Sequence, residues 1–120
     1  MLVKRLSDCV EIEAGDHTRL RELLHPARDP VHCGYSLAHA RLPVGEWSSL
    51  HRLTSSEVYY ILSGSGRMEI DGRAREVHPG DAVYIPPGAR QRIFSLGPDP
   101  LEFLCIVDPA WRVEDEEILE

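Results

Sequence analysis

The sequence predicts an all-β protein, a sandwich or closed barrel of short strands. From residue 34 onward, short apolar runs rich in β-branched and aromatic residues follow one another, as at 57–62. Glycine- and proline-containing turns separate these runs, which is typical of a sandwich or barrel and not of a parallel α/β sheet. The composition, with 42% hydrophobic and 28% charged residues, fits a globular chain.

The first 30 residues are the least regular part of the chain, and we expect N-terminal strands within them. The stretch 16–24 has two readings. Leu20, Leu23 and Leu24 have helical spacing behind a possible Asp16 cap, which suits a short amphipathic helix. The same residues also suit a strand, so the sequence leaves helix and strand open here.

Seven later runs are expected to be strands: 35–42, 57–62, 67–70, 73–77, 82–85, 91–96 and 101–107. Asp71-Gly72 joins two of them and is the strongest hairpin signal in the chain. The acidic tail, 113–120, is expected to be solvated, as a short helix or an irregular segment.

Length and charge exclude several classes of function. A chain of 120 residues corresponds to one domain, and its net charge of −7 argues against nucleic acid as a partner. No apolar stretch is long enough for a membrane span, so no membrane partner is expected. The three cysteines lack metal-site or disulfide spacing, which favours a reducing, cytoplasmic location.

Two segments resemble the paired signature of the cupin superfamily. In the first, five residues separate Gly45 from His51, and six separate Glu57 from Gly64. In the second, five residues separate Gly80 from Pro86-Pro87-Gly88, and Gln91 follows. The chain therefore resembles the small single-domain cupins (cupin 2, or mannose-6-phosphate-isomerase-like) over about 35–107. The resemblance implies one cupin domain over 1–120, a jelly-roll barrel of short antiparallel strands with a short C-terminal helix or tail.

The resemblance also implies a metal site, because such families hold a divalent ion with three histidines and a glutamate. His51 and Glu57 occupy two of these positions, whereas Leu53 and Gln91 stand where the other two histidines would be. An imidazole, a carboxylate and an amide oxygen suit Mn, Fe, Co, Ni or Zn, completed by water. The alternative is a buried His51–Glu57 pair without metal.

Three further side chains are candidates for this site. His39 lies on the strand before the first motif and would replace the donor lost at Leu53 if it faced inward, which alternation alone does not decide. Tyr59 shares a strand face with Glu57, so it is a candidate proton donor beside Glu57 as ligand or base. Tyr84 is a candidate at the cavity mouth. The remaining histidines, His25 among them, are expected at the surface.

These features lead to two functional hypotheses. The first is a metal-binding cupin that binds or acts on a small polar molecule (a sugar, acid or enol) in its cavity. As an enzyme it would be a metal-dependent isomerase or dioxygenase. The alternative is a non-catalytic small-molecule-binding cupin, or a structural dimeric cupin, with a degenerate metal site. The resemblance further implies a homodimer, since an uncovered edge strand favours association.

Overall fold

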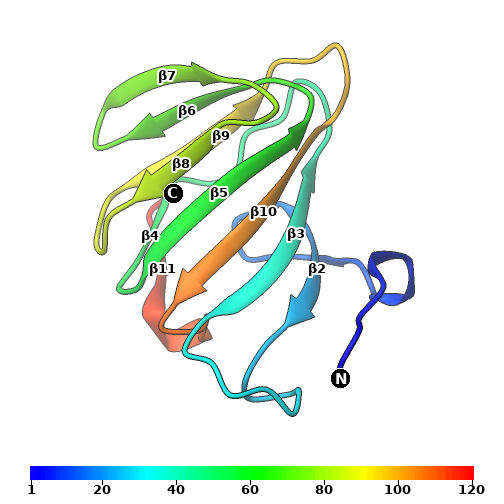
Figure 1. Cartoon of the computed structure of the whole chain (residues 1–120). Helices are drawn as coiled ribbons and strands as arrows, with labels where there is room; N and C mark the ends of the chain where they lie inside the picture. Colours follow the sequence, from blue (N-terminus) through cyan, green and yellow to red (C-terminus); the bar gives the residue numbers. More distant parts are fainter.

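Two antiparallel sheets pack face to face as a jelly-roll barrel, which confirms the fold class expected from the sequence (Figure 1). The computed structural model describes all 120 residues. The first sheet has six strands in the order β1 (Ile12–Glu13), β2 (Arg19–Leu24), β3 (Ser36–Leu42), β10 (Leu101–Asp108), β5 (Ser56–Ser63) and β8 (Ala82–Ile85). The second has five in the order β11 (Glu116–Ile118), β4 (His51–Leu53), β9 (Gln91–Ser95), β6 (Gly66–Ile70) and β7 (Arg73–Val77). Two 3₁₀ turns, Leu6–Asp8 and Val113–Asp115, are the only helical segments, and neither is long or apolar enough to cross a membrane.

Alternation along the strands separates a core face from an outer face. On β10, Phe103 and Cys105 are buried while Ile106 is exposed, and on β5 the buried Ile61 follows the exposed Tyr60. Burying side chains of this size stabilises the fold by about 1.5–3 kcal/mol each, so the apolar alternation fixes which face of each strand turns inward.

The hairpin predicted at Asp71-Gly72 joins β6 to β7. Both central residues have positive φ, 49° for Asp71 and 81° for Gly72, as a tight primed turn requires. All seven runs that the sequence indicated form strands, but β4 and β11 were not expected.

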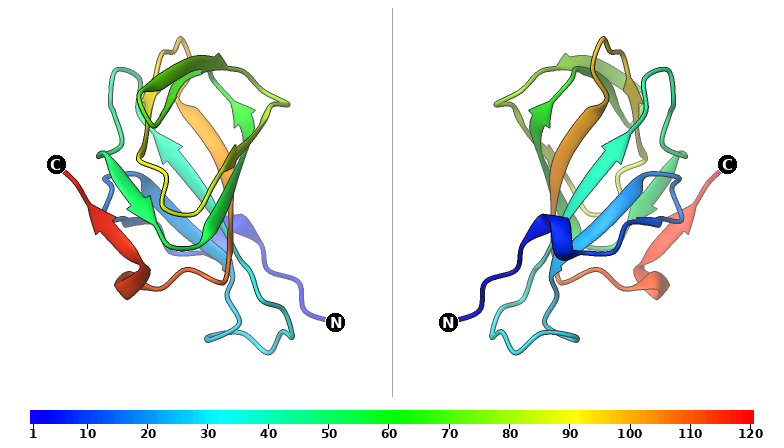
Figure 2. Two further views of the ribbon diagram at one scale, coloured as in Figure 1. Left: turned by 90° about the vertical axis from the view of Figure 1, so that its left-hand side faces the viewer. Right: turned by 90° about the vertical axis from the view of Figure 1, so that its right-hand side faces the viewer.

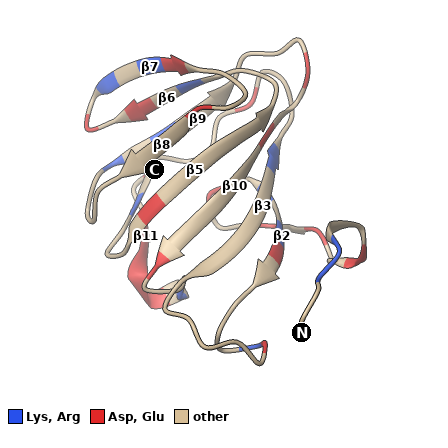
Figure 3. Cartoon of the chain, viewed as in Figure 1, with Lys and Arg blue, Asp and Glu red and all other residues tan.

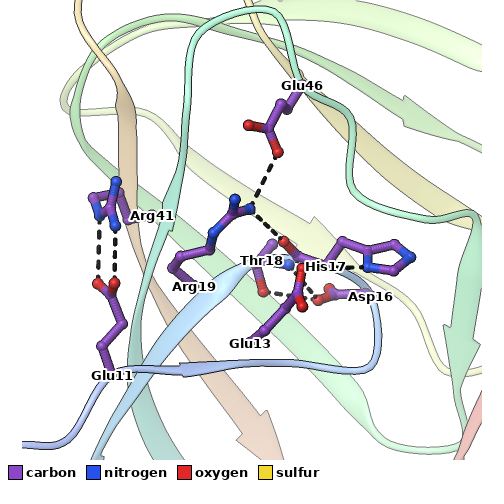
Figure 4. A network of polar contacts seen from close by, with 8 residues as sticks. All are labelled: Glu11, Glu13, Asp16, His17, Thr18, Arg19, Arg41 and Glu46. Carbon is purple, nitrogen blue, oxygen red and sulfur yellow. Dashed lines mark hydrogen bonds and ion pairs between the residues drawn. The ribbon is translucent and has the colours of Figure 1, made fainter.

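The stretch 16–24, for which helix and strand were both open, contains the strand β2. β2 pairs with β3 in antiparallel register, and this pairing outweighs the helical spacing of its leucines. Asp16 caps no helix. Its Oδ1 accepts hydrogen bonds from the backbone N–H and the hydroxyl of Thr18, at 3.1 and 2.7 Å, which shapes the turn between β1 and β2 (Figure 4). Ion pairs of Arg19 with Glu46 and of Arg41 with Glu11 tie the β1–β2 hairpin to the barrel.

The acidic C-terminal segment is more ordered than the sequence suggested. After the 3₁₀ turn at 113–115 it forms β11, which pairs with β4 at the edge of the second sheet (Figure 2). β11 pairs with backbone groups that would otherwise be unpaired at the edge of β4. Arg52 on β4 also forms an ion pair with Glu117 at 2.8 Å. His25 was expected at the surface but is buried, with its Nε2 2.7 Å from the carbonyl of Trp111 just before this segment.

Candidate functional site

A cavity of about 500 Å³ opens into the barrel at the end where β2, β5 and β10 meet the C-terminal segment. Its lining includes His51, Glu57 and Tyr59, three residues that the sequence indicated. A larger hollow of about 800 Å³ lies along β7 and β8, but apart from the exposed Tyr84 none of the candidate side chains lines it. The smaller cavity is therefore the candidate site.

His51 is held in one orientation at the wall of this cavity. It is 2% exposed, and β4 places it directly opposite Gln91 of β9. Its Nδ1 lies 2.7 Å from the backbone carbonyl of Ser49. A carbonyl oxygen only accepts hydrogen bonds, so Nδ1 carries a proton, and this hydrogen bond fixes the orientation of the ring. The ring Nε2 lies 3.5 Å from Asp16 Oδ2.

Gln91 connects the two other predicted residues. Its Nε2 donates to Glu57 Oε1 at 2.8 Å, and its Oε1 accepts from the Tyr59 hydroxyl at 3.0 Å. The structure therefore brings His51, Glu57, Gln91 and Tyr59 together, all nearly fully buried. Both ends of the amide are used in this chain of hydrogen bonds.

The electrostatic state of Glu57 follows from its burial. Loss of solvent raises the pKa of its carboxyl to about 8; the Gln91 hydrogen bond opposes the rise, and the nearby carboxylates of Asp16 and Glu116 add to it. Glu57 is therefore mostly protonated at neutral pH. Burial likewise raises the pKa of the Tyr59 hydroxyl, which stays a neutral hydrogen-bond donor.

Two residues of the site come from segments in which the sequence shows no functional motif. Asp16, in the β1–β2 turn, and Glu116, at the start of β11, both line the cavity. Burial raises the pKa of Glu116, and the charge of Asp16 adds to this rise while His51 opposes it. Figure 3 shows acidic residues on β5 and around β11 at the same end of the barrel. We call Asp16, His51, Glu57 and Glu116 the polar wall.

The β1–β2 turn packs against side chains of β11. A Cβ atom at Gly15 would lie 3.0 Å from Glu116 Oε1, so a larger residue there would displace this carboxylate. The indole of Trp111 also lines the cavity, and its Nε1 donates to Glu116 Oε2 at 3.4 Å. A sequence signal for Asp16 and Glu116 would have required knowing that the two segments meet.

The residues present do not fit a divalent metal. No three His, Cys, Asp or Glu side chains converge closely enough to hold an ion. Leu53 is a buried side chain without a donor atom, and the Gln91 amide is committed to Tyr59 and Glu57. A metal would have to break this buried hydrogen-bond chain and remove the Glu57 proton.

His39 does not complete the site. β3 directs Ala38 and Ala40 toward the interior and His39 to the opposite face, where its Nε2 lies 3.1 Å from Glu102 Oε1. The alternation was ambiguous in the sequence because small alanines flank the histidine. Tyr84 also lies outside the cavity, exposed on the outer face of β8.

Comparison with known proteins identifies relatives along most of the chain. Residues 38–107 match a family model described as a cupin domain. An uncharacterized protein of Methanocaldococcus jannaschii is 45% identical over 108 residues, which cover 88% of this chain and 84% of that protein. The oxalate-binding protein of Thermotoga maritima is 32% identical over 71 residues, and the match spans only 59% of its length.

Solved structures agree with the fold. A predicted oxalate decarboxylase from Thermotoga maritima superposes with a TM-score of 0.80 at 25% identity, covering 90% of this chain and 99% of that one. The stretch matched by the family model contains His51, Glu57 and Gln91 but neither Asp16 nor Glu116.

Proposed function

The chain belongs to the cupin-domain family, and from that premise we propose that it binds a small organic molecule in its barrel cavity without a metal ion. The observation that carries the proposal is the polar wall, which lies inside a cavity of about 500 Å³, within the size range of small-molecule sites. A fold shared by many functions does not identify a ligand, so the argument depends on the side chains that line the cavity.

The lining suits a ligand with one polar end and one apolar end. Half of the 20 lining residues are hydrophobic, among them Leu20, Phe103 and Val107. The buried polar groups of the wall are few and held in place, as at sites that orient a ligand. Glu57, a protonated acid at neutral pH, and the imidazole of His51 stand on the same wall. This pair would also suit proton transfer on a bound molecule.

A metal-dependent activity, as an isomerase or a dioxygenase, is the competing hypothesis. Cupin-family relatives commonly bind a divalent metal, and His51 and Glu57 keep two of the ligand positions implied by the family resemblance. The donor set described above argues against it in this chain, because Leu53 and the committed Gln91 leave too few free ligands.

Two tryptophans make the proposal directly testable by NMR. The indole of Trp111 lines the cavity, whereas Trp47 packs outside against Phe94 and Arg92 and serves as an internal control. A panel of neutral, cationic and anionic aromatic fragments is titrated while both indole N–H resonances are followed. We expect at least one fragment to shift Trp111 in a saturable manner and to leave Trp47 unchanged, with and without EDTA.

A matched pair of variants locates the binding. Ala38→Leu fills the cavity and is expected to abolish the Trp111 shift, whereas Ala82→Leu, on the outer face of β8, leaves it intact. The proposal fails if no fragment binds or if Ala38→Leu has no effect. Binding that EDTA removes and Mn or Zn restores would establish the metal-dependent hypothesis instead.

We also propose that the protein forms a homodimer. Four large side chains on the outer face of the first sheet are exposed, and we call them the outer apolar face: Tyr60, Leu62, Tyr84 and Ile106. Val58 on β5 lies in the same area, because it is paired with Tyr84 of β8 on one side and with Ile106 of β10 on the other. A continuous apolar surface of this kind favours burial against a second copy.

A further inference from the structure

The polar wall places the carboxylates of Asp16 and Glu116 at the cavity, beside the imidazole of His51. His51 is 2% exposed, and its Nε2 has no hydrogen bond although it borders the cavity. Glu57 is 6% exposed, and only its Oε1 has a partner. Asp16 Oδ2 lies beside the imidazole, while its Oδ1 accepts from Thr18. A ligand that pairs with the carboxylate oxygens of Asp16 and Glu116 must bring donors of its own.

The charge of the lining points the same way. Five acidic residues border the cavity: Glu13, Asp16, Glu22, Glu57 and Glu116. The one basic residue of the lining, Arg28, is bound by two hydrogen bonds to Glu22, at 2.6 and 2.5 Å. Arg28 therefore does not balance Asp16 and Glu116, and an anionic ligand would meet the negative charge of these carboxylates.

The rest of the lining fits a hydrocarbon or aromatic body. Phe103, Val107 and Leu20 form apolar walls, and the Trp111 face adds an aromatic surface beside Glu116. Aromatic faces attract cations, and a desolvated contact of this kind strengthens binding.

We infer that the ligand is a small organic cation, a primary ammonium carried on an apolar body, whose N–H donors contact the carboxylates of Asp16 and Glu116. The inference rests on the proposed cavity binding and adds the chemical class of the ligand. An ammonium group carries three donors and no acceptor, which complements the oxygens of these two carboxylates. It also relieves the mutual repulsion of the carboxylates.

Three probes of similar shape test the class: phenethylamine, phenethyl alcohol and phenylacetate. They are compared at neutral pH by calorimetry and by the Trp111 indole shift. We expect the amine to bind at least about tenfold more tightly than the alcohol, and phenylacetate not to bind measurably. Added salt is expected to weaken only the amine.

Variants assign the preference to the wall. Glu116→Gln and Asp16→Asn, each of which keeps the hydrogen-bonding shape, are expected to reduce amine affinity several-fold and leave the alcohol unchanged. Glu114→Gln, an exposed carboxylate outside the cavity, is the matched control. Equal affinity for amine and alcohol, tighter binding of phenylacetate, or no binding of the amine overturns the inference. Any other fragment that binds and is blocked by Ala38→Leu would leave the proposed function standing.

Discussion

At the scale of single residues, the buried carboxyl of Glu57 couples the site to pH. Its pKa is about 8 in the folded chain, against 4.5 for an unburied glutamate. Between these values the folded state holds a proton that the unfolded state has released. The contribution of Glu57 is therefore fully present below about pH 4.5 and is lost as pH rises toward 8.

Replacing Glu57 by Gln tests this coupling. The amide keeps an acceptor for Gln91 but does not ionise, so the stability of the variant relative to wild type is expected to rise with pH. The difference in unfolding free energy should change by roughly 1 kcal/mol per pH unit between about pH 5 and 8 and then level off. Urea unfolding across this range measures it. Glu114→Gln, which is exposed, should follow the wild type, and parallel curves for wild type and Glu57→Gln would contradict the assignment.

At the scale of elements, β4 and β9 carry the positions where this chain departs from its family. His51 and Gln91 are paired across the two strands, and Leu53 is buried on the same face of β4 as His51. The two strands therefore keep the positions at which the family resemblance puts metal ligands. Leu53 and Gln91 stand at two of these positions in place of histidines. The loss lies in the side chains, since the backbone of both strands is regular.

Restoring the donors should restore metal binding. We expect the double variant Leu53→His with Gln91→His to hold about one Zn or Mn per chain, because three imidazoles and Glu57 then share one wall. Elemental analysis after dialysis against the metal measures the content. Arg52→His alone is the control, since Arg52 is on the exposed face of β4. A double variant that holds no more metal than this control would show that the wall cannot assemble such a site.

The sequence predicted those elements whose pattern is local. The β-branched run of β5 and the turn at Asp71-Gly72 were read correctly, and motif spacing placed His51 and Glu57 on one wall. Asp16 and Glu116 escaped prediction because their position depends on β11 pairing with β4, a contact between distant segments. The sheet face toward which His39 points could not be predicted for a different reason, since its alanine neighbours carry little hydrophobic signal.

At the scale of the whole molecule, the outer apolar face lies on the first sheet, on the side of β5 that faces away from the core. The predicted dimer buries this face, so light scattering after size exclusion should give twice the 13.5 kDa of one chain. Tyr60→Glu with Ile106→Glu is expected to give monomers, because burying two carboxylates costs several kcal/mol. Val113→Glu, exposed elsewhere, should remain a dimer. A monomeric wild type, or dimers of the double variant, would contradict the proposal.

The packing of the β1–β2 turn against β11 has a consequence for classifying relatives of this protein. The stretch that identifies the family, 38–107, holds the barrel and half of the polar wall, while Asp16 and Glu116 come from flanking segments. Two proteins with the same barrel motifs can therefore differ in the charge of their cavities. Grouping relatives by function requires alignment of the flanks, with an acidic residue after the glycine of the first turn and another in the terminal strand as the distinguishing marks.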